Sequence, residues 1–134
     1  EHLAPHTTSN ENFKGIADDT GRGVFNGKIF VKQDAQTISA TQSSRNLLLS
    51  NNAEIDTQPE LEIYADDVQC AHGATVGQLS ETELFYLRSR GIDYSTARTM
   101  LTIAFVGDLV EGIQIESLQR LVESRITKLI TSAS

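Results

Sequence analysis

The chain has 134 residues, of which 39% are hydrophobic and 22% charged, and its formal net charge is −7 with an isoelectric point near 4.8. An acidic chain repels phosphate, which argues against nucleic acid as a partner. No apolar run approaches the roughly 18 residues of a membrane span, which argues against a membrane partner. The single cysteine excludes an internal disulfide and fits a reducing compartment. The length suits one domain or two small modules sharing a core, and we expect the chain to be part of a longer protein.

The first stretch, residues 1 to about 23, is polar and punctuated by proline and glycine, which predicts an irregular segment. Phe13 and Ile16 are its expected core contacts. His2 and His6 are four residues apart, but the proline between them argues against a helix that could present both to one ligand. We therefore interpret the two histidines as loop or surface residues rather than a metal pair.

From residue 24 to residue 76 the pattern changes to short β-like runs that recur every six to nine residues or so. Such spacing suggests a sandwich, a barrel or a β-solenoid, and the scarcity of long hairpin arms favours the solenoid. Two polar segments, 33–36 and 40–44, could form side-chain ladders between stacked strands or a binding surface. We favour the ladders. The expected strands are 24–25, 29–31, 37–41, 47–49, 53–55, 61–64 and 68–70, with turns at 26–27, 50–52, 58–59 and 66–67.

At Ser80 the apolar period becomes helical. The sequence Ser80-Glu81-Thr82-Glu83 has the form of a capping box and predicts a helix over 81–89 that stops at Gly91. A second helix follows a cap at Asp93 or Ser95 and is weakened at two glycines, and a third runs from about 115 to 129. We interpret the apolar stripes as core residues in preference to a partner surface, although part of them could dock another protein. The stripe residues are Leu84, Phe85 and Leu87; Ala97, Met100, Leu101, Ala104, Phe105, Leu109 and Ile113; and Leu118, Leu121, Val122, Ile126, Leu129 and Ile130.

Cys70 and His72 are the one thiol and its nearest imidazole, and on a strand their side chains leave the same face. They would lie about 7 Å apart, which argues against a Cys/His hydrolase; that reading would also need a thiol of low pKa. A zinc or cluster site needs three or four protein ligands, so a site here would need ligands from elsewhere. Residue types alone favour a buried, inert Cys70 with a hydrogen-bonded His72. No phosphate loop, nucleophile elbow or His-Glu-x-x-His motif occurs, and no catalytic residue is assigned.

Several longer motifs carry a resemblance to a known family. They are YADDVQCAHGATVG (64–77), LFYLRSRGI (84–92), HLAPHTTS (2–9), GVFNGKI (23–29) and NLLLS (46–50). Together they resemble the C-terminal part of proteins of the SufB/SufD family of iron–sulfur cluster assembly, over nearly the whole chain. The Cys-x-His-Gly-Ala-Thr form is similar to the SufD members, because the SufB members usually carry a Glu after the His.

The resemblance implies a mainly β chain with C-terminal helices: the end of a right-handed parallel β-helix over residues 1–78, followed by a helical module over 79–134. It implies a non-catalytic scaffold, not an enzyme, in a complex of SufB, SufD and the ATPase SufC, cytoplasmic in bacteria or stromal in plastids. It places His72, with Cys70 as the weaker candidate, near the SufB interface. There an iron–sulfur cluster or iron would be held transiently with a SufB cysteine, and none stably by this chain alone.

Two further possibilities stay open. The chain could be a structural β-solenoid interaction module with no metal role, and its exposed strand edges could pair two copies into a homodimer. The residues expected to dock SufC are Phe85, Tyr86, Arg88, Arg90, Met100 and Phe105.

Overall fold

The computed structural model describes residues 1–132 and divides into two compact units, Glu1–Gly77 and Gln78–Ser134. The first unit is built from strands and the second from helices, so the chain is mainly β with C-terminal helices, as predicted. Each unit is described by itself.

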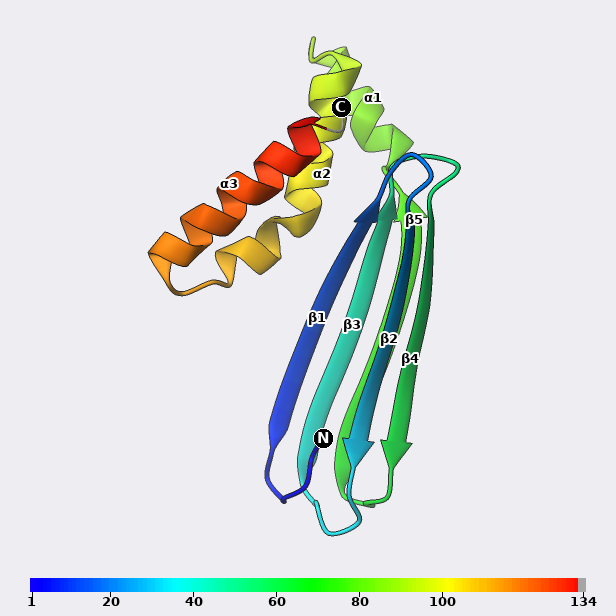
Figure 1. Cartoon of the computed structure of the whole chain (residues 1–134), viewed down its shortest axis with the longest axis vertical. Coiled ribbons are helices and arrows are strands. Elements are labelled where there is room, and N and C mark those ends of the chain that lie inside the picture. The colour runs from blue at the N-terminus through cyan, green and yellow to red at the C-terminus, as the bar shows by residue number, and fades with distance from the viewer. Residues whose placement is uncertain (133–134) are drawn as a thin grey trace. The chain divides into compact units, whose positions relative to one another are not determined.

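The first unit consists of parallel sheets. The strands of one sheet lie in the order β1-β3-β5, and β2 and β4 form a second sheet. The chain thus alternates between the two sheets, and the strands of one run opposite to those of the other (Figure 1). The strands are β1 (Thr8–Ala17), β2 (Arg22–Val31), β3 (Ile38–Leu48), β4 (Glu54–Ile63) and β5 (Val68–Gln78).

The register of each pair shows a constant repeat. β1 pairs with β3 from Thr8↔Ser39 onward, and β2 pairs with β4 from Arg22↔Glu54 onward, both in parallel. The offsets are therefore 31 (39 − 8) and 32 (54 − 22) residues. The corners keep the same spacing, because His6 and Thr37 both have a left-handed backbone, with φ of 60° and 61°.

Several sequence predictions about the strands are wrong. Residues 8–17, expected to be irregular, form β1, and the short runs expected from residue 24 onward merge into strands of 10 or 11 residues. The turns expected at 26–27 and 58–59 lie inside β2 and β4, where Asn26 pairs with Gln58 and Gly27 with Pro59. Proline is tolerated there because β4 is an edge strand. The turn at 50–52 and the bend at 66–67 are confirmed.

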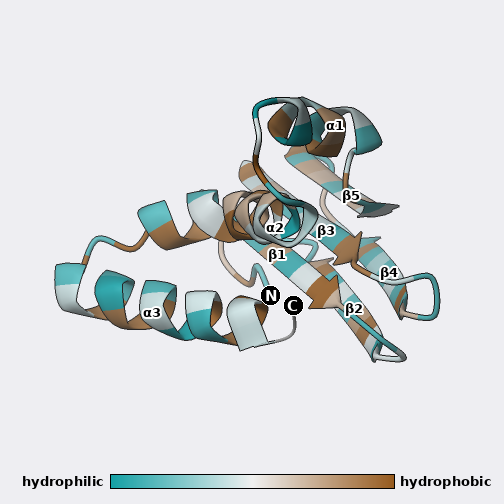
Figure 2. Ribbon diagram, turned by 90° about the horizontal axis from the view of Figure 1, so that it is seen from above, coloured by the Kyte–Doolittle hydropathy of each residue, from teal (hydrophilic) through white to brown (hydrophobic). Residues whose placement is uncertain are grey.

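Side chains alternate between the inside and the outside of the unit, and Figure 2 shows the corresponding bands of polar and apolar residues along the strands. The inward face of β3 begins apolar at Ile38 and Ala40 and continues polar, with Gln42, Ser44 and Asn46 all buried. The apolar cluster consists of Ile29, Val31, Ala35, Ile38, Ala40 and Ala65, with Leu61, Ile63, Val68 and Cys70 packed against it.

Polar ladders connect β1 to β3, as predicted for residues 40–44, whereas residues 33–36 lie outside the strands. Thr41 Oγ1 donates a hydrogen bond to Asn10 Oδ1 at 3.0 Å, and Gln42 Nε2 donates one to Glu11 Oε2 at 2.8 Å. The two donors sit on β3 and the two acceptors on the facing positions of β1. These bonds join neighbouring strands 31 residues apart in the chain, so they reinforce the repeat.

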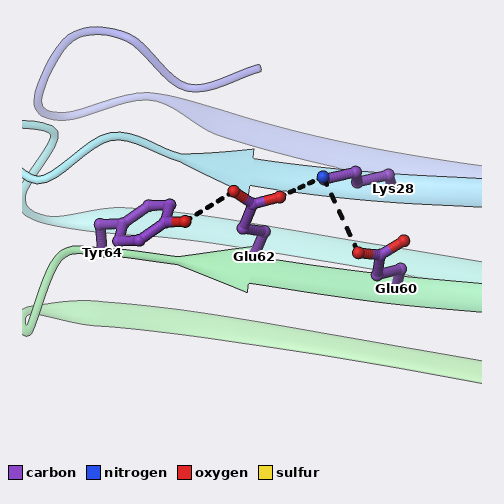
Figure 3. Close-up of polar contacts among 4 residues, drawn as sticks. All are labelled: Lys28, Glu60, Glu62 and Tyr64. Atoms are coloured by element: carbon purple, nitrogen blue, oxygen red, sulfur yellow. Dashed lines mark hydrogen bonds and ion pairs between the residues drawn. The ribbon is translucent and has the colours of Figure 1, made fainter.

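A charged network lies on the outward face of the second sheet (Figure 3). Lys28 on β2 forms an ion pair with Glu62 on β4 and lies 3.8 Å from a carboxylate oxygen of Glu60, while Tyr64 Oη donates to Glu62 Oε1 at 2.7 Å. The hydrogen bonds from Lys28 and Tyr64 lower the pKa of Glu62, and the acceptor Glu62 raises the pKa of both donors. All these groups are exposed or half-exposed, so the network contributes little to stability.

The second unit contains three helices, and their starts follow the predicted caps. Ser80 Oγ accepts from the Glu83 N–H at 3.3 Å, and Asp93 Oδ1 accepts from the Thr96 N–H at 3.0 Å. The first helix ends before Gly91, whose φ is 87°. Of the two glycines expected to weaken the second helix, Gly107 lies within it and Gly112 caps its end. The helices are α1 (Glu81–Ser89), α2 (Tyr94–Glu111) and α3 (Glu116–Ser132).

Only part of the predicted apolar stripes is buried, and Leu84, Ala97 and Ile130 are the members that are. In α2 the buried residues are Ala97, Thr102, Val106 and Val110, whereas Met100 is 46% exposed. In α1 only Leu84 of the predicted stripe is buried, and Phe85 is 73% exposed. The interpretation of Met100 and Phe85 as core residues is therefore wrong.

Candidate functional site

The strand β5 carries both predicted site residues, Cys70 and His72. It is the last strand in the order β1-β3-β5, so within the described residues its outer edge has no partner strand. Because the two residues are two apart on one strand, their side chains leave the same face. Cys70 is half-buried against the apolar cluster, whereas His72, one step further along, is exposed.

The environment of Cys70 disfavours a reactive thiolate. Burial raises the pKa of the thiol, and a backbone hydrogen bond from Ala40 opposes that rise only in part. A nucleophilic or metal-binding cysteine needs the thiolate, and therefore a lowered pKa. A Cys/His hydrolase would need a Cys70 thiol of lowered pKa, which this structure does not provide. Of the two residues, His72 is the accessible one that could bind a metal.

The described residues hold no ready-made metal site. Among residues 1–132, no group of three or more His, Cys, Asp and Glu side chains could hold a metal ion. A single exposed imidazole and a thiol of raised pKa fit, at most, part of a cluster site, because a complete one needs three or four ligands. A cluster that involves His72 would need its other ligands from a second protein.

The two N-terminal histidines, His2 and His6, are not part of the candidate site on β5. His2 lies outside the strands, as the loop prediction implied, but it is only 7% exposed and so is not a surface residue. Its backbone pairs with the chain at Phe30 and Lys32, and its two ring nitrogens lie 2.6 Å from Thr7 Oγ1 and 2.9 Å from Ser9 Oγ. His2 is thus a satisfied structural residue. His6 is exposed, as predicted.

Two further residues hold β5 in place, and both were missed by the sequence reasoning. Asp67, immediately before β5, is bonded through its backbone and its carboxylate to the corner at Thr37. Asn46 on β3 donates a side-chain hydrogen bond to the Thr75 carbonyl of β5. These contacts join residues 29 or 30 positions apart, so no local sequence motif could have predicted them.

The predicted docking residues of the helical unit are largely accessible. Phe85, Tyr86, Arg88, Arg90 and Met100 are exposed, and Phe105 is half-buried. The guanidinium carbon of Arg90 lies 5.0 Å from the centre of the Tyr86 ring, within the range of a cation–π contact. The structure therefore presents aromatic and cationic groups on α1. In the part of the chain that is described, no helix combines the length and the apolar character needed to cross a membrane.

Comparison with known proteins gives a family for this arrangement. The family model described as "SUF system FeS cluster assembly, SufBD core domain" matches residues 1–105. The iron–sulfur cluster assembly protein SufD of Escherichia coli (strain K12) is 46% identical over 94% of this chain and 30% of its own length. An iron–sulfur cluster assembly SufBD family protein of Synechocystis is 49% identical over 86% of the chain and 25% of its own length.

A more distant relative, the iron–sulfur cluster assembly protein SufD of Bacillus subtilis, is 34% identical over 87% of the chain and 26% of its own length. The chain thus spans between 25% and 30% of the length of these three relatives. The family match covers all of the first unit and reaches into α2. The chain belongs to the SufB/SufD family of iron–sulfur cluster assembly proteins and is SufD-like within it.

Proposed function

We propose that this chain is part of a non-catalytic scaffold subunit of an assembly complex with SufB and SufC, in which His72 supplies one side of the site where a cluster is built. The observation that carries the proposal is the position of His72, which is exposed on an edge strand without a partner strand among the described residues. A cysteine of SufB would approach from that edge. The cluster is the cargo of this site rather than a resident group.

The parallel sheets support the finer fold in this proposal. Successive strands alternate between the sheets, with partner offsets of 31 and 32 residues, so each turn of the chain would place one strand in each sheet. Crossover connections between parallel strands are almost always right-handed. Residues 1–78 would therefore be the end of a right-handed parallel β-helix, with residues 79–134 as the helical module.

The test compares two matched histidine variants in the full-length protein assembled with SufB and SufC. We expect His72→Asn to lower the yield of assembled cluster by about ten-fold or more, the scale on which lost metal-site contacts act. His6→Asn is the control, because His6 is also exposed and asparagine tolerates its left-handed backbone. Subunit copurification should be unchanged in both. A normal cluster yield from His72→Asn would refute the proposal and favour a structural interaction module without a metal role.

Docking of SufC would use the exposed aromatic and cationic groups of α1 and neighbouring residues of α2. Phe85 supports this, because a phenylalanine that is 73% exposed in a helix contributes little to folding the described chain. We expect Phe85→Ser to reduce copurification of SufC, while Leu129→Ser on α3, which is 69% exposed, serves as the matched control. Equal retention of SufC by the two variants would place the docking surface elsewhere.

The free edge of β5 could also pair with a second copy of this chain. Sedimentation of the chain with and without SufB separates this homodimer from the mixed complex. A dimer that SufB displaces would show that the two partners compete for one edge.

A further inference from the structure

The strand that carries His72 is attached to the rest of the first unit at two points that flank this residue. Asp67 lies five positions before His72 and Thr75 lies three positions after it. Every residue from Ala71 to Gly77 is exposed, so side-chain packing does not fix this part of β5. Its position depends on the pairing with β3 and on the two attachments.

The first attachment is a backbone corner in an unusual conformation. Thr37 has a φ of 61°, which is rare for a β-branched residue. Its N–H donates to the Asp67 carbonyl at 2.7 Å and its hydroxyl to Asp67 Oδ2 at 3.0 Å, while the Asp67 N–H donates to Gln36 Oε1 at 2.9 Å. Such strain persists only where surrounding contacts over-determine it, and here they converge on the residue that precedes β5.

The second attachment is the amide of Asn46, which is 6% exposed. Its Nδ2 donates to Ser44 Oγ at 3.1 Å and to the Thr75 carbonyl at 3.2 Å. On the neighbouring strand, Gly15 faces Asn46, and a Cβ at that position would collide with Asn46 Oδ1. The missing side chain of Gly15 therefore makes the room in which the Asn46 amide is held, aimed at β5.

We propose that Asn46 is a positioning residue for His72: its amide fixes the backbone of β5 on the far side of His72 from the Thr37 corner. This inference rests on the proposed role of His72 in cluster assembly. A cluster shared between two proteins requires each ligand to be held closely in place, and a bare edge strand cannot do this through its own side chains. Asn46 supplies the constraint from the inside of the unit.

The test replaces the amide while keeping its shape, in the full-length protein assembled with SufB and SufC. Asn46→Leu removes both donors, and Ser44→Ala is the matched control, because it removes the other acceptor of the same amide and leaves the bond to Thr75. We expect Asn46→Leu to speed amide hydrogen exchange at 74–76 by about five-fold, the effect of one hydrogen bond. Cluster yield should fall by a similar factor, with copurification unchanged. Ser44→Ala should leave the exchange of β5 and the yield as they are.

Asn46→Ala repeats the test without the bulk of leucine, in case the leucine variant does not assemble. Unchanged exchange of β5 in an assembled Asn46 variant would overturn the inference, whatever His72→Asn does. Faster exchange with full cluster yield would also overturn it, because Asn46 would then be structural only. If His72→Asn has no effect on yield, the proposed function fails on its own, and the exchange measurement still decides whether Asn46 fixes β5.

Discussion

The substitution Gly27→Ala tests how tightly the interior of the first unit is filled. Gly27 lies on β2, and the side chain of Gln42 reaches across from β3 into the space that a larger residue would need. A Cβ at position 27 would lie 2.5 Å from Gln42 Oε1 and 2.7 Å from its Cδ and Nε2. Gln42 is only 3% exposed and donates to the Glu11 carboxylate at 2.8 Å, so its amide cannot withdraw freely.

The cost follows from the two ways in which the protein could respond. Keeping the hydrogen bond means overpacking, at about 1–3 kcal/mol. Moving the amide means losing a hydrogen bond to a charged group, at about 1.5–3 kcal/mol. The protein takes the cheaper response, roughly 2 kcal/mol, and replacing glycine in a strand returns about 0.5–1 kcal/mol. We therefore expect Gly27→Ala to lower the free energy of unfolding by about 1–1.5 kcal/mol.

Urea unfolding followed by far-ultraviolet circular dichroism measures this difference. Gly73→Ala on β5 is the control, since nothing lies within 4 Å of the added Cβ there, and its stability should equal or slightly exceed that of the parent. The double variant Gly27→Ala/Gln42→Ala should be less destabilised than the sum of the two single variants, because Gln42→Ala removes the colliding amide. Additive effects of the two changes would refute the proposed collision.

Three other predictions concern titratable groups. Because burial raises the pKa of Cys70, its alkylation by iodoacetamide at neutral pH should be slower than that of an unstructured cysteine peptide, and an equal rate would contradict the burial argument. The bonds from the Thr96 hydroxyl and N–H lower the pKa of Asp93, so the capped start of α2 should be fully stable above the ordinary aspartate range and weaken as the pH falls through the lowered value. We expect this loss of helix to appear as a weaker circular dichroism signal at 222 nm when the pH is lowered. Asp93→Asn should abolish that pH dependence, and its persistence in the variant would exclude Asp93 as the source. Glu62→Gln should lower the pKa of Tyr64 toward its usual range in an ultraviolet titration at 295 nm, since the Glu62 carboxylate is the main cause of the rise.

The helices could be predicted closely because their signals are local. A cap and the residues it bonds lie three positions apart, as in Ser80 with Glu83 and Asp93 with Thr96. The strands could not, because a parallel strand is defined by a partner some 31 residues away. Asn26-Gly27 has the chemistry of a hairpin turn, yet in β2 it pairs with Gln58-Pro59, and that pairing overrides the local preference.

The candidate site divides in the same way. The strand period placed Cys70 and His72 on one face of β5. The structure adds that, along this face, Cys70 packs against the apolar cluster and His72 is exposed. Asn46 could not be singled out, because its meaning depends on Thr75 and Gly15, which come near it only once the sheet has formed. The exposed Met100 was misjudged because apolar periodicity alone does not say which face of a helix the rest of the protein covers.

The two strands that come last in their sheets differ in a way that bears on the handling of the isolated chain. β4 carries four carboxylates, at positions 54, 56, 60 and 62, and a proline that cannot donate a hydrogen bond. Charge and proline are common devices against unwanted sheet extension. β5 has no Asp, Glu, Lys or Arg and no proline from Val68 to Gln78. Aggregation during purification should therefore start at β5, and a single lysine on its outward face, such as Ala71→Lys, would be the first change to try for solubility.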